Sequence, residues 1–255
     1  MNTEIKPRRA DLVLVERQLA ASRTQAQRLI AAGQVELREA GRWRTLEKPS
    51  EKLPDDSELR VQAGPEQQFA SRGGLKLQAA LKAFAVDPAG LTVLDVGQST
   101  GGFTDCLLQQ GAARVVGVDV GRDQLAASLR ADARVVCLEG INARDLPADQ
   151  LLIHAPGGFP LIVMDVSFIS QTLILPSLAP LLAQGGVMVS LVKPQFEVGK
   201  AGVGKGGIVK NKGLYAEVEA KLRACCQALD LKVLGYIDSP ITGTDGNREF
   251  FICVS

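Results

Sequence analysis

Four charged residues stand in or beside apolar segments where packing alone does not require a charge. Lys76 lies within residues 71–77, whereas Asp165, Lys193 and Glu249 stand at the ends of strand-like apolar runs. Strand ends can converge over one edge of a sheet, so we expect the last three side chains to lie close together. Each residue alone is better explained as a solvated charge. Together they predict a site for general acid–base chemistry, which uses ammonium and carboxylate groups.

A glycine-rich loop follows the first apolar run, in residues 94–103. Three glycines and two small hydroxyl residues between a strand and a helix let the backbone approach a ligand, and the helix N-terminus offers free N–H groups. The spacing is not G-x-G-x-x-G, which favours a mononucleoside-type cofactor over a dinucleotide. A tight turn without a ligand is the alternative. The candidate cofactor-binding residues here are Asp95, Gly97, Ser99, Thr100, Gly101, Gly102 and Phe103.

Two polar residues beyond this loop extend the candidate cofactor site. Asp119 ends the next apolar run, 22 residues after Gly97. A carboxylate near this offset accepts hydrogen bonds from both hydroxyls of an adenosine ribose. After a third run, residues 140–145 offer polar groups for the edge of an adenine, with Asn142 as the candidate. An ordinary surface turn explains residues 140–145 nearly as well.

A second glycine-rich stretch, residues 199–206, fits the G-x-x-x-x-G-K pattern of nucleotide-hydrolysing loops. Gly206, however, stands where that motif needs Ser or Thr for magnesium, and no helix clearly begins at Lys205. Nucleotide hydrolysis is therefore rejected. We expect a lysine-bearing loop that contacts phosphate groups, with a plain flexible loop as the alternative.

From residue 71 onward, apolar strand-like runs alternate with helical periodicity. Almost continuously apolar, β-branched strands that alternate with helices predict a parallel sheet covered on both faces, with room for a final antiparallel pair. We therefore expect an α/β fold with a seven-stranded Rossmann-like domain. The predicted strands are 92–96, 114–119, 134–138, 161–166, 186–192, 232–237 and 249–254, and the predicted helices are 102–110, 123–131, 171–183 and 213–229.

The first residues predict a separate small α+β domain with two short helices and a hairpin. Ser22 followed by Gln25 is a capping-box pattern, and Gly33 stands where a helix would end. Residues 1–44 carry nine Lys or Arg against five Asp or Glu, which suits contact with a polyanion. The predicted domains are 1–62, a linker at 63–70, and 71–255.

Composition narrows the class of protein. With 46% hydrophobic and 22% charged residues, the chain matches an ordinary globular protein. It contains no apolar run of about 18 residues, and residues 1–10 are too polar for a signal peptide. The five cysteines form no C-x-x-C pair, and His154 is the only histidine. We therefore expect a cytoplasmic protein without a membrane partner or a required metal.

These features resemble the TlyA family of FtsJ-like rRNA methyltransferases, which carry an appended RNA-binding domain. The similarity covers nearly the whole chain, and residues 8–38 resemble the alpha-L RNA-binding motif. Gln98 is bulkier than the residue usual in this loop, and residues 38–43 fit the RNA-binding motif loosely. The segments that carry the resemblance are 71–77, 94–105, 165–170, 192–197 and 204–207. By motif, the family's Lys–Asp–Lys–Glu tetrad falls on Lys76, Asp165, Lys193 and Glu249.

The resemblance implies methyl transfer from S-adenosylmethionine to a ribose 2′-hydroxyl of ribosomal RNA, specifically of a cytidine. Lys193 would then be the base, with Lys76 lowering the pKa of Lys193 and orienting the ribose, while Asp165 and Glu249 hold the two ammonium groups. Partners would be ribosomal RNA or ribosomal subunits. The expected RNA-binding residues are Arg8, Arg9, Ser22, Arg23, Gln25 and Arg28.

Three other functions remain open at this stage. A non-catalytic RNA-binding or ribosome-assembly protein could retain such a fold, although an apparently complete tetrad disfavours it. A haemolysin, a label attached to relatives, is disfavoured because the sequence shows no signal peptide or membrane span. Methylation of a base would not require two lysines at these positions.

Overall fold

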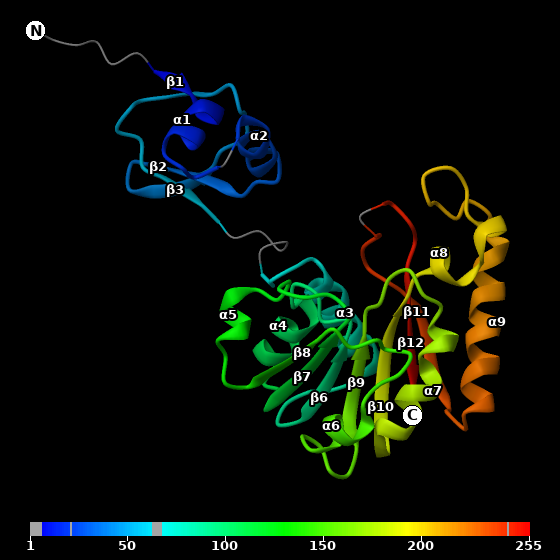
Figure 1. Cartoon of the computed structure of the whole chain (residues 1–255). Helices are drawn as coiled ribbons and strands as arrows, with labels where there is room; N and C mark the ends of the chain where they lie inside the picture. The colour runs from blue at the N-terminus through cyan, green and yellow to red at the C-terminus, as the bar shows by residue number, and fades with distance from the viewer. Residues whose placement is uncertain (1–6, 21, 63–67, 244) are drawn as a thin grey trace, which may run out of the picture. The chain divides into compact units, whose positions relative to one another are not determined.

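Two units make up the chain, Met1–Gln68 and Phe69–Ser255, in the computed structural model (Figure 1). The structure describes residues 7–20, 22–62, 68–243 and 245–255. The division between the units falls within the predicted linker, of which residues 63–67 lie outside the described residues.

The smaller unit packs two helices against short antiparallel sheets. Ser22 accepts a hydrogen bond from the Gln25 backbone N–H at 3.2 Å, which confirms the predicted helix cap, and Gly33 has a φ of +70° just after the helix. Val35 and Leu37 point into the core because alternate strand residues face it. Its elements are β1 (Arg8–Arg9), α1 (Ala10–Glu16), α2 (Arg23–Ala31), β2 (Val35–Glu39), β3 (Arg42–Thr45), β4 (Lys52–Leu53) and β5 (Leu59–Val61), with sheets β1-β4 and β3-β2-β5.

The larger unit is built on a seven-stranded sheet in the order β11-β12-β10-β9-β6-β7-β8. Five neighbouring strands run parallel, and β12 runs antiparallel to both β10 and β11, as the sequence allowed. Its strands are β6 (Thr92–Val96), β7 (Arg114–Asp119), β8 (Val135–Glu139), β9 (Phe159–Met164), β10 (Leu182–Val192), β11 (Val233–Asp238) and β12 (Phe250–Val254).

Helices cover both faces of this sheet (Figure 1). Successive residues of β6 face opposite sides of the sheet. Val93 packs in the core that contains residues of α3 and α4, whereas Leu94 packs in the core that contains residues of α7 and α9. This two-sided burial explains why the strands are apolar almost throughout. The helices are α3 (Gly73–Phe84), α4 (Gly102–Gln109), α5 (Ala127–Arg130), α6 (Ala148–Leu152), α7 (Leu175–Leu178), α8 (Pro194–Glu197) and α9 (Gly213–Ala228), with 3₁₀ turns η2 (Gln171–Leu173), η3 (Ala179–Leu181) and η4 (Lys200–Gly202).

Strand register brings the predicted site residues to one edge. Val96 pairs with both Val118 and Met164, so Gly97, Asp119 and Asp165, each one residue further along the chain, lie at the same edge of the sheet. In an open parallel sheet, this carboxyl edge beside the point where strand order reverses is where ligands bind.

Two predicted helices are wrong in extent. The helix predicted at 123–131 is reduced to α5, because Asp123 has a left-handed φ of +57° and its N–H donates to Glu139 instead. The helix predicted at 171–183 is broken into η2, α7 and η3. Pro176 and Pro180 each stand at the start of a new turn, because proline has no N–H for the preceding one.

Candidate active site

Two cavities adjoin at the carboxyl edge of the sheet and share four wall residues, Gly97, Ser99, Asp165 and Ser167. The tetrad cavity, of about 470 Å³, contains all four tetrad residues. The Asp119 cavity, of about 450 Å³, is lined by Asp119 and Asn142 together with apolar side chains. Both volumes lie in the range of small-molecule sites.

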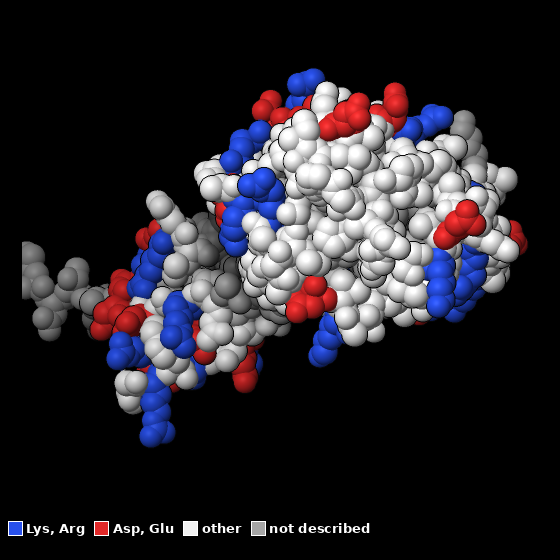
Figure 2. Space-filling model, turned by 90° about the horizontal axis from the view of Figure 1, so that it is seen from below, with Lys and Arg blue, Asp and Glu red and all other residues white. Residues whose placement is uncertain are grey.

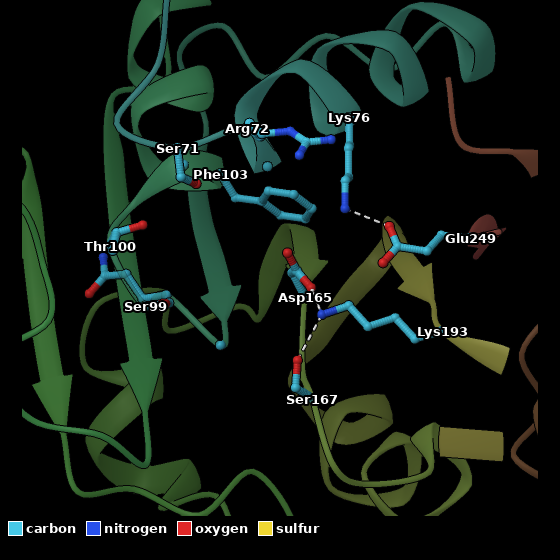
Figure 3. A pocket seen from close by; sticks show the side chains of 14 residues that line it. Ser71, Arg72, Lys76, Ser99, Thr100, Phe103, Asp165, Ser167, Lys193 and Glu249 are labelled. Carbon is cyan, nitrogen blue, oxygen red and sulfur yellow. Dashed lines mark hydrogen bonds and ion pairs between the residues drawn. The ribbon is translucent and has the colours of Figure 1, made fainter. Parts of the chain in front are cut away.

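The tetrad forms two ion pairs inside its cavity (Figure 3). The Lys76 ammonium lies 2.5 Å from a Glu249 oxygen, and the Lys193 ammonium lies 2.6 Å from an Asp165 oxygen. The Lys76 and Glu249 side chains are 10% and 3% exposed, so their pair is almost entirely removed from water. Burial raises the pKa of the Glu249 carboxyl, and the hydrogen bond from Lys76 opposes that rise. A charge buried in this way needs its partner, so each acid holds its lysine in place.

Ser167 is a contact that the sequence analysis did not single out. Its hydroxyl accepts a hydrogen bond from the Lys193 ammonium at 2.9 Å, and the residue lines both cavities. The predicted strand ran through Val166, but β9 ends at Met164, so residues 165–167 lie in the loop that forms the cavity wall. The sequence signal that could have identified Ser167 is its position, because it is a polar residue two places after the Asp165 carboxylate.

The glycine loop approaches neighbouring residues closely. Gly97 has a φ of +85°, and a Cβ built on it would lie 2.3 Å from the Asp165 carbonyl oxygen. A Cβ on Gly102 would lie 2.1 Å from the Ser71 hydroxyl. Thr100 and Phe103 complete this part of the tetrad cavity wall. Only glycine fits at 97, where both the backbone angle and the space exclude a side chain.

Asp119 and Asn142 stand in the wall of the second cavity. The Asp119 carboxylate accepts hydrogen bonds of 2.7 Å from the backbone N–H groups of Ser99 and Gly121, which fix its position beside the glycine loop. Val120 and Ile141 supply apolar surface between these polar groups. The cavity therefore combines a fixed carboxylate with apolar walls, as a nucleoside site requires.

Asp95 and Gly101 belong to the predicted cofactor residues but are not among those that line either cavity. Asp95 is fully buried and accepts a hydrogen bond of 2.6 Å from the Thr104 hydroxyl, which in turn accepts one of 2.9 Å from the Gln98 amide. Burial raises the pKa of the Asp95 carboxyl to about 7, against the effect of the Thr104 bond. Gln98 fills the space above Gly117, where a Cβ would meet it at 2.0 Å. The hydrogen bonds that join Asp95, Thr104 and Gln98 therefore support the glycine loop.

In the smaller unit, Asp11 connects two of the predicted RNA-binding residues. Its carboxylate is completely buried and accepts hydrogen bonds from Arg9, Arg23 and Gln27 at 2.8 to 3.0 Å. The bond from Arg9, followed by those from Gln27 and Arg23, holds the pKa of the Asp11 carboxyl well below its usual range despite burial. The acid therefore fixes the guanidinium groups of Arg9, just before α1, and of Arg23, at the start of α2.

The remaining predicted RNA-binding arginines differ from each other. Arg8 is paired with Glu16 and Asp55, whereas Arg28 is an exposed residue in the last turn of α2. Figure 2 shows basic and acidic side chains intermixed over this unit, in agreement with its ion pairs. A phosphate group would thus compete with Glu16 and Asp55 for Arg8. At Arg28 it would not compete with these two acids.

Comparison with known proteins identifies the larger unit. A model of the FtsJ-like methyltransferase family matches residues 69–255. The chain belongs to this family. It is an S-adenosylmethionine-dependent methyltransferase, and the predicted seven-stranded Rossmann-like fold is confirmed.

Relatives resemble the chain over nearly its whole length. YqxC, a proposed rRNA methyltransferase of Bacillus subtilis, is 46% identical over 97% of this chain and 85% of its own. The 16S/23S rRNA (cytidine-2′-O)-methyltransferase TlyA of Mycobacterium tuberculosis is 44% identical over 96% of this chain and 88% of its own. Among solved structures, a proposed hemolysin from Streptococcus thermophilus has a TM-score of 0.71 and 39% identity, and the match covers 98% of this chain and 88% of that one. Among the described residues, none of the helices is both long and apolar enough to cross a membrane.

Proposed function

We propose that this chain methylates the 2′-hydroxyl of a cytidine ribose in ribosomal RNA. The observation that carries the proposal is the adjacency of the two cavities. Asp165 and Ser167 form part of both walls, so a group bound in the Asp119 cavity would meet the Lys193 side chain. The relatives named as rRNA methyltransferases support ribosomal RNA as the substrate. Action on ribosomal RNA would in turn imply work in the cytoplasm.

The Asp119 cavity fits the adenosine part of S-adenosylmethionine. The Asp119 carboxylate is suited to the ribose hydroxyls, Asn142 to the edge of the adenine, and Ile141 to its face. Gly97 lines both cavities, so the remainder of the cofactor would lie beside it. Ser99 and Thr100, on the same loop, would contact that remainder. When bound, the cofactor supplies a methyl group on a positively charged sulfonium.

The tetrad supplies alignment and a base. Methyl transfer is an in-line displacement, so most of the rate acceleration comes from holding the ribose oxygen, the methyl carbon and the sulfur in line. In the reaction the hydroxyl O–H bond breaks as the oxygen–methyl bond forms and the carbon–sulfur bond breaks. Lys193 Nζ accepts the proton. Asp165 and Ser167 hold that nitrogen in place, and Lys76, fixed by Glu249, orients the ribose.

Lys193 would act on the reacting hydroxyl in the tetrad cavity, whereas the predicted adenosine contacts line the Asp119 cavity. Removal of the lysine should therefore affect the chemical step far more than cofactor binding.

The smaller unit would supply RNA affinity through its arginines. A ribose 2′-hydroxyl distinguishes RNA from DNA, and phosphate contacts by arginine give affinity that depends on salt. Arg9 and Arg23, held by Asp11, and the exposed Arg28 are the best placed for such contacts. Arg8, Ser22 and Gln25 remain candidates beside them.

Transfer of labelled methyl groups from S-adenosylmethionine to purified ribosomal RNA and to ribosomal subunits tests the proposal. Ribose-methylation-sensitive primer extension would then locate the product. We expect a stop at one cytidine ribose that disappears with Lys193→Ala. Cofactor and RNA binding without transfer to any subunit would favour a ribosome-assembly factor instead, and a methylated base would exclude the ribose as the acceptor.

A further inference from the structure

Residues 199–212, here named the glycine–lysine loop, carry four lysines and no acidic residue. Lys205, Lys210 and Lys212 are exposed. The loop lacks the architecture of a nucleotide-hydrolysing motif, because α9 begins only at Gly213. Its charge suits RNA phosphates, as the sequence predicted. What the sequence did not reveal is how the loop is attached to the rest of the site.

Asn247 makes that attachment. It is a polar residue only 1% exposed, and its side-chain amide spans two segments. Its Nδ2 donates to the Gly207 carbonyl oxygen at 2.9 Å and to an Asp245 carboxylate oxygen at 2.7 Å, while its Oδ1 accepts from the Val209 N–H at 3.0 Å. One side chain therefore joins the middle of the glycine–lysine loop to the segment before β12.

The segment before β12 also contacts Glu249. The Gly243 N–H donates to the Asn247 carbonyl oxygen at 2.9 Å, which closes a turn. A Cβ built on Gly243 would lie 2.8 Å from Glu249 Oε1, so this turn packs directly on the carboxylate that holds Lys76. Gln195, two residues after Lys193, donates to Asp245 at 3.4 Å from the other side. The turn thus contacts both the acid of one ion pair and the segment that carries the lysine of the other.

We propose that Asn247 is a positioning residue that couples the glycine–lysine loop to the Lys76–Glu249 pair, so that RNA bound on the loop helps to set the catalytic geometry. This inference rests on the proposed RNA methyl transfer. A buried amide with three satisfied side-chain hydrogen bonds gives the link one defined geometry. A small misplacement at a reacting centre can cost about 100-fold in rate, so a single broken bond in the link should be measurable.

Asn247→Asp is the test variant because it keeps the size and the acceptor for Val209 but removes the donor to both Gly207 and Asp245. Gln150→Glu is the control for the added charge: Gln150 is exposed on α6 and lies outside the glycine–lysine loop. With ribosomal RNA as substrate, we expect Asn247→Asp to lower kcat by about 10- to 100-fold and to raise KM for RNA. Gln150→Glu should leave both unchanged, and S-adenosylmethionine affinity and Tm should show that both variants are folded.

Tyr215→Phe separates coupling from simple anchoring. The Tyr215 hydroxyl donates to the Val209 carbonyl oxygen at 3.0 Å from α9 and so holds the same loop without touching the turn. Its loss should raise KM for RNA and leave kcat unchanged. If Asn247→Asp also changed KM alone, Asn247 would be only an anchor and the proposal would be wrong.

Tryptic cleavage after Lys205 and Lys210 tests the attachment without activity. Cleavage should be faster in Asn247→Asp than in Gln150→Glu, and equal rates would overturn the inference. If the unmodified protein transferred no methyl group to RNA, the proposed function would fail instead, and the cleavage comparison would still decide whether Asn247 holds the loop.

Discussion

Val192 and Phe250 pair directly across the antiparallel β10–β12 ladder. Lys193 follows the first of them and Glu249 precedes the second, so the reversed direction of β12 brings the start of that strand to the carboxyl edge of the parallel strands. A parallel β12 would carry its first residue to the opposite edge. The antiparallel strand is therefore what allows the fourth member of the tetrad to join the other three.

Lys193→Ala should lower kcat for methyl transfer by about 100- to 10,000-fold, which is the usual contribution of a general base. Affinity for S-adenosylmethionine should change little, because the predicted adenosine contacts lie in the other cavity. Single-turnover transfer and calorimetric cofactor binding measure the two effects separately. Lys82→Ala, at an exposed position on α3, is the control and should behave as the unmodified protein. Near-normal turnover of Lys193→Ala would remove this residue from the mechanism.

Gly97→Ala should abolish cofactor binding and destabilise the larger unit. The added Cβ would meet the Asp165 carbonyl oxygen at 2.3 Å, and the φ of +85° adds backbone strain. Gly90→Ala is a matched control, because Gly90 has a φ of +74° but no atom within 4 Å of a built Cβ. It should cost only about 1 kcal/mol of unfolding free energy. Calorimetry and urea unfolding of both variants would show whether the clash, rather than the angle, decides the outcome at 97.

Asp95 should make stability fall as pH rises towards neutrality. Burial raises the pKa of this carboxyl to about 7 in the folded protein, whereas an unfolded aspartate releases its proton near pH 4. Between these values the folded state holds one more proton, so the unfolding free energy decreases by up to about 1.4 kcal/mol per pH unit. Asp95→Asn cannot titrate and should lack this slope. Urea unfolding at about pH 5 and about pH 7 measures it. The control Asp149→Asn, exposed on α6, should retain the slope.

Apolar periodicity was sufficient to predict the strands of the larger unit. All seven were found to within a few residues at either end, because buried strands need continuous apolar side chains whatever their neighbours are. The strand ends carried the site, since Asp119, Asp165 and Lys193 each stand at the last residue of a strand or directly after it. Asp165 and Lys193 of the tetrad could be found from the sequence for this reason.

Features that depend on tertiary contacts could not be found in this way. Gln98 appeared only as an unusually bulky residue of the loop, whereas the structure shows it filling the space above Gly117 and bonded to Thr104. The link from Asn247 to Gly207 joins residues 40 positions apart, and no local pattern encodes such a bond. Helix 123–131 was overestimated because the left-handed backbone at Asp123 is invisible in hydrophobic spacing.

Replacing Arg23 and Arg28 together by alanine should weaken RNA binding and flatten its dependence on salt. Each lost phosphate contact reduces the slope of log affinity against log salt by about 0.7 to 0.9, so two lost contacts reduce it by roughly 1.5. Binding of ribosomal RNA fragments across a salt series measures both quantities. If affinity and slope were unchanged, the methyltransferase unit would be the main RNA contact.

Asp11→Asn tests whether the buried acid positions Arg9 and Arg23. The amide retains an acceptor oxygen but removes the charge that both guanidinium groups contact, so the arginines should no longer be fixed. RNA affinity should fall although no phosphate-contacting side chain has been deleted, and the salt slope should change less than in the arginine double variant.

The lowered pKa of Asp11 also stabilises the folded unit above about pH 4, and that stabilisation is lost as pH falls below this value. The variant should therefore unfold more easily at neutral pH and show a weaker acid dependence. Unchanged RNA affinity in a folded Asp11→Asn protein would show that Arg9 and Arg23 need no such support.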